Sequence, residues 1–157
     1  MSGLEIEKQS AFAYFIKPDG SAGADISESA GQRSGDLGYQ WIRVLHATPG
    51  ETPLVFDDLN LPQIVVDALL AVETQPRFSK LAGGLLLVLR GANTQSQADP
   101  DDMVSVRLWV EPNRIISVQL RHVLSVEELA QSCEHGEAPA TISRLVFTLI
   151  DSLSNKV

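Results

Sequence analysis

The run of apolar residues at 85–89, Leu-Leu-Leu-Val-Leu, constrains the fold more than any other feature of this sequence. Successive side chains of a strand point to opposite faces of a sheet, so a strand that is apolar throughout must be covered on both faces. The preceding pair Gly83-Gly84 is a strong signal of a hairpin turn joining strands at 77–82 and 85–91. We therefore expect 85–89 to form a central strand, either with helices on both sides or deep in a sandwich.

Alternation of apolar and polar residues predicts a second antiparallel hairpin after the polar connection at 92–102. Its arms lie at 104–110 and 116–120, around a turn at 111–114. Because valine, leucine and isoleucine recur at every second position of both arms, we expect this hairpin to present one apolar face.

The N-terminal part of the chain predicts two further strands with a loop between them. Residues 11–16 are rich in aromatic side chains, and residues 39–47 alternate between apolar and polar positions. The glycine-rich stretch 20–38 has no apolar period, which indicates a mobile loop with at most one short helical turn at 26–30.

Helical spacing marks three segments in the rest of the chain. After Pro62 the helix stripe consists of Leu61, Ile64, Val65, Ala68, Leu69 and Val72. Ser125 and Glu128 form a capping box that predicts a short helix ending near Cys133, closed by Gly136. A last helix opens at Pro139 and Thr141, with the stripe Ile142, Leu145, Val146, Leu149, Ile150 and Leu153. Because that stripe reaches the end of the chain, we expect residues 1–157 to be one domain of a longer protein.

These elements predict an α+β domain, which is also describable as mixed-sheet α/β. The chain has 157 residues, of which 44% are hydrophobic, and this is enough for a single core.

Its net charge of -8 argues against binding to nucleic acid or to an anionic membrane surface, since both need a cationic face. The lone Cys133 excludes a disulfide framework. The longest uncharged apolar stretch, 81–89, is too short to cross a bilayer.

Catalytic chemistry finds little support in the sequence. There is no Gly-x-Ser-x-Gly nucleophile motif. Cys133 and His135 are two residues apart on a predicted helix, so their side chains face different ways. His46 and His122 lie at strand ends, where an edge histidine is the simpler interpretation. A hydrolase that uses His122 or Cys133 is therefore the least supported hypothesis, and we expect no enzyme.

The sequence contains two groups of candidate metal ligands, and a metal site is better supported than a catalytic site. Cys133, His135 and Glu137 combine soft and hard ligand types within five residues, but they lack the paired spacing of a structural zinc site. The polar C-terminal turn of a helix is the interpretation that we favour for them. The second group consists of Asp99, Asp101 and Asp102, whose carboxylates suit a hard cation but lack the spacing of a calcium loop. A turn before a strand is the simpler interpretation of that group.

Several segments together resemble the CorA-like metal-ion transporter superfamily, in particular its zinc-transporter (ZntB-like) branch. Residues 73–77, Glu-Thr-Gln-Pro-Arg, are similar to the Glu-Thr-Arg-Pro-Arg segment of that branch, with Gln75 where the branch often has arginine. Residues 89–93, Leu-Arg-Gly-Ala-Asn, match its Leu-Arg-Gly-x-Asn. The most specific match is 101–109 with 114–117, which resembles Glu-Asp-Met-Val-Ser-x-Arg-x-Trp followed by Arg-x-Ile-Ser.

The resemblance implies the N-terminal cytoplasmic domain of a zinc or other divalent-cation transporter, at the cytoplasmic face of the inner membrane. It implies an α/β/α sandwich on a mixed, largely antiparallel sheet, whose last helix leads into a membrane stalk. In the family, two membrane helices with a Gly-Met-Asn signature follow and the protein is a homo-pentamer.

The expected roles are assembly, an acidic vestibule and metal sensing through weakly bound Zn²⁺ or Mg²⁺, with no required cofactor and no transport by this segment alone. The matched segments themselves suit structural roles, with Pro76 as a helix stop and with Arg77 and Arg107 as ion-pair or strand-face residues. The alternative is a free-standing cytosolic binding or oligomerisation module without a membrane partner.

Overall fold

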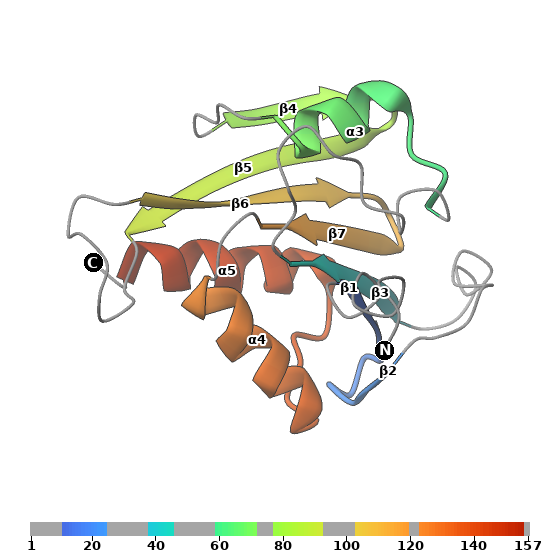
Figure 1. Ribbon diagram of the computed structural model, residues 1–157. Coiled ribbons are helices and arrows are strands. Elements are labelled where there is room, and N and C mark those ends of the chain that lie inside the picture. Colours follow the sequence, from blue (N-terminus) through green and yellow to red (C-terminus); the bar gives the residue numbers. More distant parts are fainter. Residues whose placement is uncertain are drawn as a thin grey trace, which may run out of the picture.

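The computed structural model describes residues 11–24, 38–45, 59–71, 77–92, 103–119 and 123–155. Within these residues a seven-stranded sheet carries helices on both faces (Figure 1). The strands are β1 (Ala11–Ile16), β2 (Ala22–Ala24), β3 (Tyr39–Val44), β4 (Arg77–Leu81), β5 (Gly84–Ala92), β6 (Met103–Val110) and β7 (Arg114–Val118). The helices are α3 (Gln63–Leu69), α4 (Leu124–Glu134) and α5 (Ile142–Asn155).

The sheet is mixed and largely antiparallel, as expected. Its strand order is β2-β1-β3-β7-β6-β5-β4, so the two edges are β2 and β4. The pair β3 and β7 is parallel, whereas the other neighbouring pairs run antiparallel. The parallel pair joins the N-terminal strands to the two later hairpins in one sheet.

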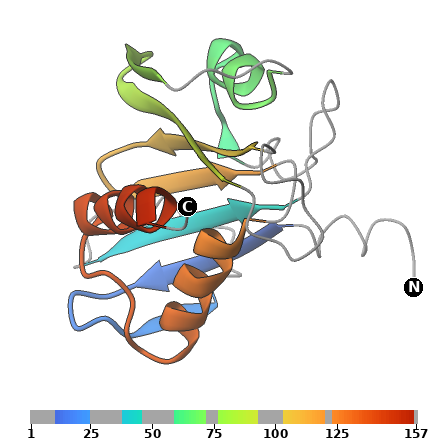
Figure 2. The same cartoon turned by 90° about the vertical axis from the view of Figure 1, so that its left-hand side faces the viewer.

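Two hydrophobic cores lie on opposite faces of the sheet. Helices α4 and α5 cover one face, and the core between them and the sheet contains Trp41, Leu108, Leu129 and Leu149; we call it the α4/α5 core. Helix α3 covers the other face, where Val65 and Leu69 pack in the α3 core with Ile42, Trp109 and Ile116. The view in Figure 2 shows α4 and α5 on one side of the sheet and α3 near the β4 edge. The expected α/β/α sandwich is therefore confirmed.

The double burial of residues 85–89 is confirmed, but their central place is not. Leu86 points into the α3 core and Leu87 into the α4/α5 core, because successive strand residues alternate. However, β5 is next to the edge strand, and β7 is the middle strand of the sheet. An apolar run indicates that a strand is buried on both faces. A strand next to the edge of the sheet is also buried on both faces when helices cover it.

The first hairpin forms as predicted, with its turn one residue earlier than expected. Leu81 pairs with Gly84, so Ala82 and Gly83 make the turn, both with positive φ (48° and 84°). Gly84 belongs to β5 and not to the turn, so the turn does not explain why this position is a glycine. A Cβ at that position would lie 2.4 Å from Cζ2 of the buried Trp109, so the indole ring excludes any larger residue.

The second hairpin also forms, but the expectation of a single apolar face is wrong. Leu108 pairs with Ser117, and Trp109 pairs with Ile116. Partners across an antiparallel pair share a face, so Leu108 points into the α4/α5 core while Ile116 points into the α3 core. The two apolar stripes therefore lie on opposite faces, and both faces of the hairpin are buried.

Three local expectations are corrected. Residues 22–24 form the edge strand β2 within the stretch expected to be a loop. Ile64, expected in the α3 stripe, is 56% exposed, and Val66 is buried in its place. Ser125 does not cap α4, because Val123 is the N-cap residue and no side chain caps the helix there. The buried Ser125 hydroxyl instead accepts a 2.9 Å hydrogen bond from the Ser152 hydroxyl of α5.

The C-terminal helix begins and packs as predicted. The Thr141 hydroxyl accepts a 3.2 Å hydrogen bond from the backbone N–H of Arg144, which is an N-capping contact. Leu145, Leu149 and Leu153 are buried, whereas Ile150 at the margin of the predicted stripe is 41% exposed.

Several predicted features lie outside the described residues. They are the helical turn at 26–30, the strand ends at 46–47 and at 120, and the residues His46, Val72, Pro76, His122, Asp99, Asp101 and Asp102.

Candidate functional site

The proposed ligands Cys133, His135 and Glu137 lie in the turn that ends α4. The backbone N–H of Glu137 donates to the Ser132 carbonyl at 2.8 Å, and that of Gly136 donates to the Cys133 carbonyl at 3.2 Å. With Gly136 at φ 74°, this is the Schellman motif that closes many helices. The favoured interpretation of this segment as a polar helix end is therefore confirmed.

The same turn separates the three candidate ligands. The Cys133 side chain is buried in the α4/α5 core with 1% of its surface exposed, whereas His135 and Glu137 are exposed. Burial raises the pKa of the Cys133 thiol to about 11, which disfavours the thiolate that a metal requires. Within the residues that the structure describes, no three His, Cys, Asp or Glu side chains are grouped closely enough to hold a metal ion.

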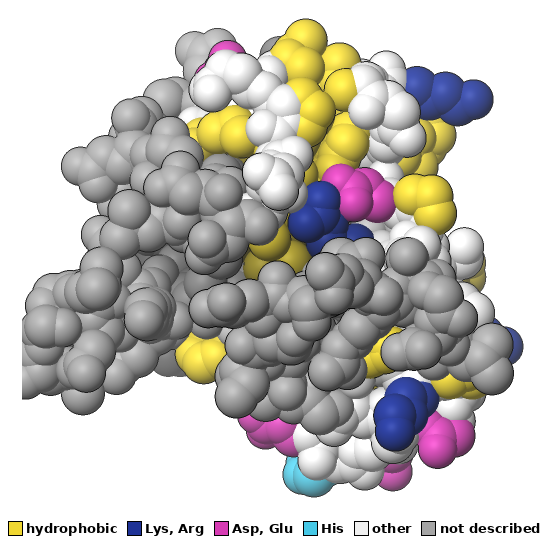
Figure 3. All heavy atoms as spheres, turned by 90° about the vertical axis from the view of Figure 1, so that its right-hand side faces the viewer, with side chains coloured by type: hydrophobic (Ala, Val, Ile, Leu, Met, Phe, Trp, Pro, Cys, Tyr) yellow, Lys and Arg dark blue, Asp and Glu magenta, His cyan; other side chains and the backbone are white. Residues whose placement is uncertain are grey.

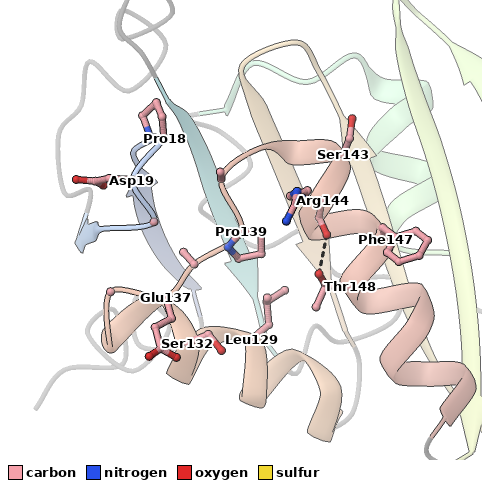
Figure 4. Close-up of a pocket in the computed structure, with 14 residues that line it drawn as sticks. Pro18, Asp19, Leu129, Ser132, Glu137, Pro139, Ser143, Arg144, Phe147 and Thr148 are labelled. Carbon is pink, nitrogen blue, oxygen red and sulfur yellow. Dashed lines mark hydrogen bonds between the residues drawn. The ribbon is translucent and has the colours of Figure 1, made fainter.

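A groove of about 870 Å³ lies beside this turn, and we call it the α4–α5 groove (Figure 4). It is lined by residues of the β1–β2 turn, of α4 with its C-terminal turn, and of α5. Asp19 and Glu137 lie towards one end, Phe147 lies at the other end on α5, and Arg144 lies between them. Phe147 is 70% exposed. The groove therefore combines an acidic end with an apolar end.

The shape of the groove depends on how the β1–β2 turn docks onto the segment before α5. The Ala138 backbone N–H donates to the Gly20 carbonyl at 3.0 Å. Gly20 has φ 87°, and a Cβ there would lie 3.2 Å from the carbonyl oxygens of Gly136 and Ala138. A glycine is required here for both reasons, because the backbone conformation is left-handed and the approach is close.

Asp19 is held in a fixed position at the acidic end. Its Oδ1 accepts hydrogen bonds from the Ser21 hydroxyl at 2.6 Å and from the Ser21 backbone N–H at 2.8 Å. These hydrogen bonds favour the ionised form and lower the pKa of Asp19 below its ordinary value. The carboxylate is therefore charged and orientated at neutral pH.

A buried cation secures α4 to the sheet. The Arg43 guanidinium donates to the Glu127 carboxylate at 2.8 Å, and its carbon lies 5.7 and 5.6 Å from the ring centroids of Phe12 and Trp41. Tyr39 adds a second anchor, because its hydroxyl donates to the Pro139 carbonyl at 2.7 Å. Burial raises the pKa of Tyr39, so the phenol remains a donor.

Arg107, expected to be an ion-pair or strand-face residue, is a core residue with 1% of its surface exposed. It donates to the carbonyl of Leu69, the last residue of α3, at 3.0 Å. A cation at a helix C-terminus satisfies an orphan carbonyl and complements the helix dipole. Burial lowers the pKa of Arg107. Its role among the described residues is therefore to join α3 to β6.

On one face of the molecule the described charged side chains do not gather into a single field. On the face that Figure 3 shows, acidic and basic side chains occur in small groups among hydrophobic ones. The excess of acidic residues in the whole sequence is therefore not concentrated in the described part of this face.

Sequence patterns could not reveal the α4–α5 groove. Asp19 and Glu137 are more than one hundred positions apart in the sequence, and they line the same groove only because the β1–β2 turn docks beside the end of α4. One local signal of the groove is Phe147. Helix periodicity places this large apolar residue outside the buried stripe of α5, where its side chain is exposed.

Solved structures show the same fold. The full-length CmaX protein superposes on this chain with a TM-score of 0.78 and 27% identity, covering 94% of this chain and 46% of CmaX. The cytoplasmic domain of ZntB from Vibrio parahaemolyticus superposes with a TM-score of 0.74 and 23% identity, covering 93% of this chain and 58% of that one. The fold is therefore that of the cytoplasmic domains of CorA-type proteins.

Sequence comparison establishes the family. A profile described as CorA-like Mg²⁺ transporter protein matches residues 36–157, and the chain belongs to that family. It is 35% identical over 118 residues to the divalent cation transporter CmaX of Pseudomonas aeruginosa, and 27% identical over 115 residues to the zinc transport protein ZntB of Cronobacter sakazakii. The family resemblance of the motifs is thereby confirmed.

The alignment covers only part of these relatives. It spans 74% of this chain but 36% of CmaX, and 73% of this chain but 35% of ZntB. Among the described residues, no helix combines the length and the apolar character that a membrane crossing requires.

Proposed function

We propose that this chain is the cytoplasmic domain of a divalent metal-ion transporter at the inner membrane, with zinc as the cargo. The identity of 35% to a protein named as a divalent cation transporter carries this proposal. The similarity to zinc transport proteins and the motif at 101–109 support zinc as the ion. The domain has a structural and regulatory role, and it catalyses no reaction of its own.

Assembly and cation attraction are the two contributions that we propose for the domain. The net charge of -8 raises the local concentration of divalent cations near the protein by long-range attraction. Weak binding by carboxylates such as those of Asp99, Asp101 and Asp102 would then report the cytoplasmic cation level. Cys133 is a poor ligand in this scheme, because its thiol is buried and protonated.

Thermal unfolding in the presence of metal tests the sensing role. Zinc or magnesium chloride should raise the melting temperature above that in sodium chloride of equal ionic strength, because a ligand that binds only the folded state stabilises it. At a hundredfold excess over Kd the stabilisation is about 2.7 kcal/mol. Replacing Asp99, Asp101 and Asp102 by asparagine should remove the shift, and replacing His135 by alanine should leave it. If millimolar metal produces no shift, the domain has no sensing role.

The transporter assignment has a separate test in the gene. The coding sequence read past the codon for Val157 should specify a long helix and two apolar spans of about 20 residues. The resemblance implies that the first span ends in Gly-Met-Asn. A stop codon after Val157 would contradict the proposal and favour a free-standing module.

A further inference from the structure

The C-terminal helix α5 lies along β5 and runs in the same direction. At the start of the helix, Ile142 lines one hollow together with Gly84 and Leu85, which begin β5. At its end, Leu153 lies over Gly91, close to the end of β5. Figure 1 shows the helix and the strand finishing at the same side of the molecule. The side chains on this face of β5 therefore set the height of α5 above the sheet.

The face of β5 that α5 covers changes in side-chain size towards the end of the strand. Because strand residues two apart share a face, one row faces the helix, and it consists of Leu85, Leu87, Leu89 and Gly91. The three leucines pack in or against the α4/α5 core, whereas Gly91 is buried without a side chain. The row therefore holds α5 away from the strand at its first positions and lets it approach the strand at the last one.

The last turn of α5 makes this close approach. A Cβ at Gly91 would lie 2.9 Å from Cδ2 of Leu153, and 3.3 Å from its Cβ and from its carbonyl oxygen. Carbon atoms pack at about 3.5–4.0 Å from one another. Rotation of the leucine side chain would relieve the contact with Cδ2. The Cβ and the carbonyl oxygen move only with the helix, so a side chain at position 91 displaces the helix itself.

A second contact holds the same turn from the side. The Ser152 hydroxyl donates to the Ser125 hydroxyl of α4 at 2.9 Å, and Ser125 is buried. Because serine has few rotamers to lose, a hydrogen bond between two serines holds the helices at a narrow range of distances. The last turn of α5 is therefore fixed to the sheet and to α4 through adjacent residues.

We propose that Gly91 is a positioning residue, which fixes the direction of the last turn of α5 together with the Ser125–Ser152 hydrogen bond. This gives a role to the glycine of segment 89–93, which resembles Leu-Arg-Gly-x-Asn. The consequence for transport rests on the proposed function. In a transporter whose chain continues from α5 towards the membrane, the direction of this turn sets the orientation of the domain.

Amide hydrogen exchange followed by NMR tests the positioning role. Gly91→Val should make the amides of Ser152 and Leu153 exchange about tenfold faster, because the new side chain lifts the last turn and opens it locally. The amide of Leu145, which donates to the Thr141 carbonyl in the first turn, should keep its protection. The milder change Gly91→Ala should give the same pattern at about threefold, because only the Cβ is added.

The matched control is Arg90→Val, which adds the same β-branched residue at the neighbouring position. Arg90 is exposed, and its side chain lies on the face of β5 opposite to the row that meets α5. Arg90→Val should therefore leave the exchange of Ser152 and Leu153 unchanged.

A second-site change tests the contact itself. Leu153→Ala shortens the side chain over position 91, so Gly91→Val with Leu153→Ala should recover about threefold of the lost protection at Ser152. The recovery is partial because the helix backbone still meets the new valine. Leu145→Ala removes the same volume from the buried side of α5 far from Gly91, and it should give no recovery.

Uptake of radioactive zinc by the longer protein connects this positioning with transport. Gly91→Val should lower uptake at an equal protein level, because a displaced helix changes the orientation that the domain passes on. Arg90→Val should leave uptake unchanged. Normal uptake by Gly91→Val would show that transport does not depend on the direction of this turn.

Three results would separate the parts of the proposal. If Gly91→Val and Arg90→Val exchange alike, the last turn does not depend on Gly91 and the proposal is wrong. If Gly91→Val accelerates exchange equally at Leu145 and Ser152, Gly91 contributes to overall stability and has no positioning role. If the exchange pattern is as expected and the unchanged longer protein carries no cation, the proposed function fails while the positioning of α5 stands.

Discussion

The Arg43 guanidinium of β3 lies 2.8 Å from the Glu127 carboxylate of α4, and this contact crosses from the sheet to the helix layer. The Arg43 side chain is 5% exposed and that of Glu127 is 31% exposed, so the cation is buried and the anion is partly solvated. Loss of the anion leaves a buried charge without its carboxylate, which costs more than the pair contributes.

Glu127→Gln should therefore destabilise the domain by about 1–2 kcal/mol, a value kept small because the carboxylate is partly solvated. Urea unfolding monitored by circular dichroism measures this loss. Glu134→Gln, an exposed change on the same helix, serves as the control and should stay within about 0.5 kcal/mol of the original chain. Equal effects of the two changes would show that the Arg43 contact does not stabilise the fold.

The pair Leu87 and Phe78 provides a test of how far burial extends towards the β4 edge of the sheet. They are partners across the two strands, yet Leu87 is 7% exposed and Phe78 is 64% exposed. Leu87→Ala should cost about 2–4 kcal/mol through the cavity that it leaves, and Leu87→Asp should unfold the domain. Phe78→Ala should cost less than about 0.5 kcal/mol, because the side chain is exposed. A Leu87→Asp chain that melts cooperatively would mean that this core is misplaced.

The close contact between Gly84 and Trp109 predicts that Gly84 tolerates no larger residue, whereas Gly83 does. Gly84→Ala should destabilise the domain by about 1–3 kcal/mol, because the new methyl group collides with the buried indole. Gly83→Asn should be tolerated within about 0.5 kcal/mol, since the space around Gly83 is open and asparagine accepts a positive φ in this turn. Thermal denaturation of both variants checks the difference, and a harmless Gly84→Ala would contradict the packing.

The buried Cys133 thiol predicts a loss of stability at alkaline pH. Its pKa rises from an ordinary value of 9.0 to about 11 in the folded chain. Between these values the unfolded chain releases the thiol proton and the folded chain keeps it, so unfolding is favoured as pH rises. The full effect is about 1.4 kcal/mol per pH unit in that window.

Urea unfolding of the original chain and of Cys133→Ala at pH 8 and pH 10 isolates this contribution. The original chain should lose more stability between the two pH values than the variant does. Tyr39, whose pKa is also raised, is present in both chains, so its contribution largely cancels from the difference. Equal losses of stability in the two chains would show that burial does not raise the pKa of the Cys133 thiol.

Much of the fold followed from local patterns, because the periodicities of strands and helices are properties of the backbone. The two hairpins, the stripe of α5 and the closure of α4 by Gly136 each depend on residues near one another in the sequence. Ser125 shows the limit of this reasoning. Its spacing to Glu128 fits a capping box, but a hydrogen bond with Ser152 on another helix occupies the hydroxyl.

The candidate metal ligands show the same limit. Cys133, His135 and Glu137 are close in the sequence, and the helix geometry places the first in the core and the others in solvent. The family, in contrast, could be predicted from motifs alone, and the profile match over residues 36–157 confirms it.

Most of the helices and strands, the double burial of residues 85–89 and the family could be predicted from the sequence, whereas the edge strand β2 could not. Each of the predictable features is encoded in short stretches of chain, where side-chain periodicity and turn chemistry act directly. The order of the strands in the sheet, the burial of Arg43 and Arg107, and the α4–α5 groove became visible in the three-dimensional structure alone. These features join residues far apart in the sequence, and they arise because two helix layers must cover both faces of one sheet at once.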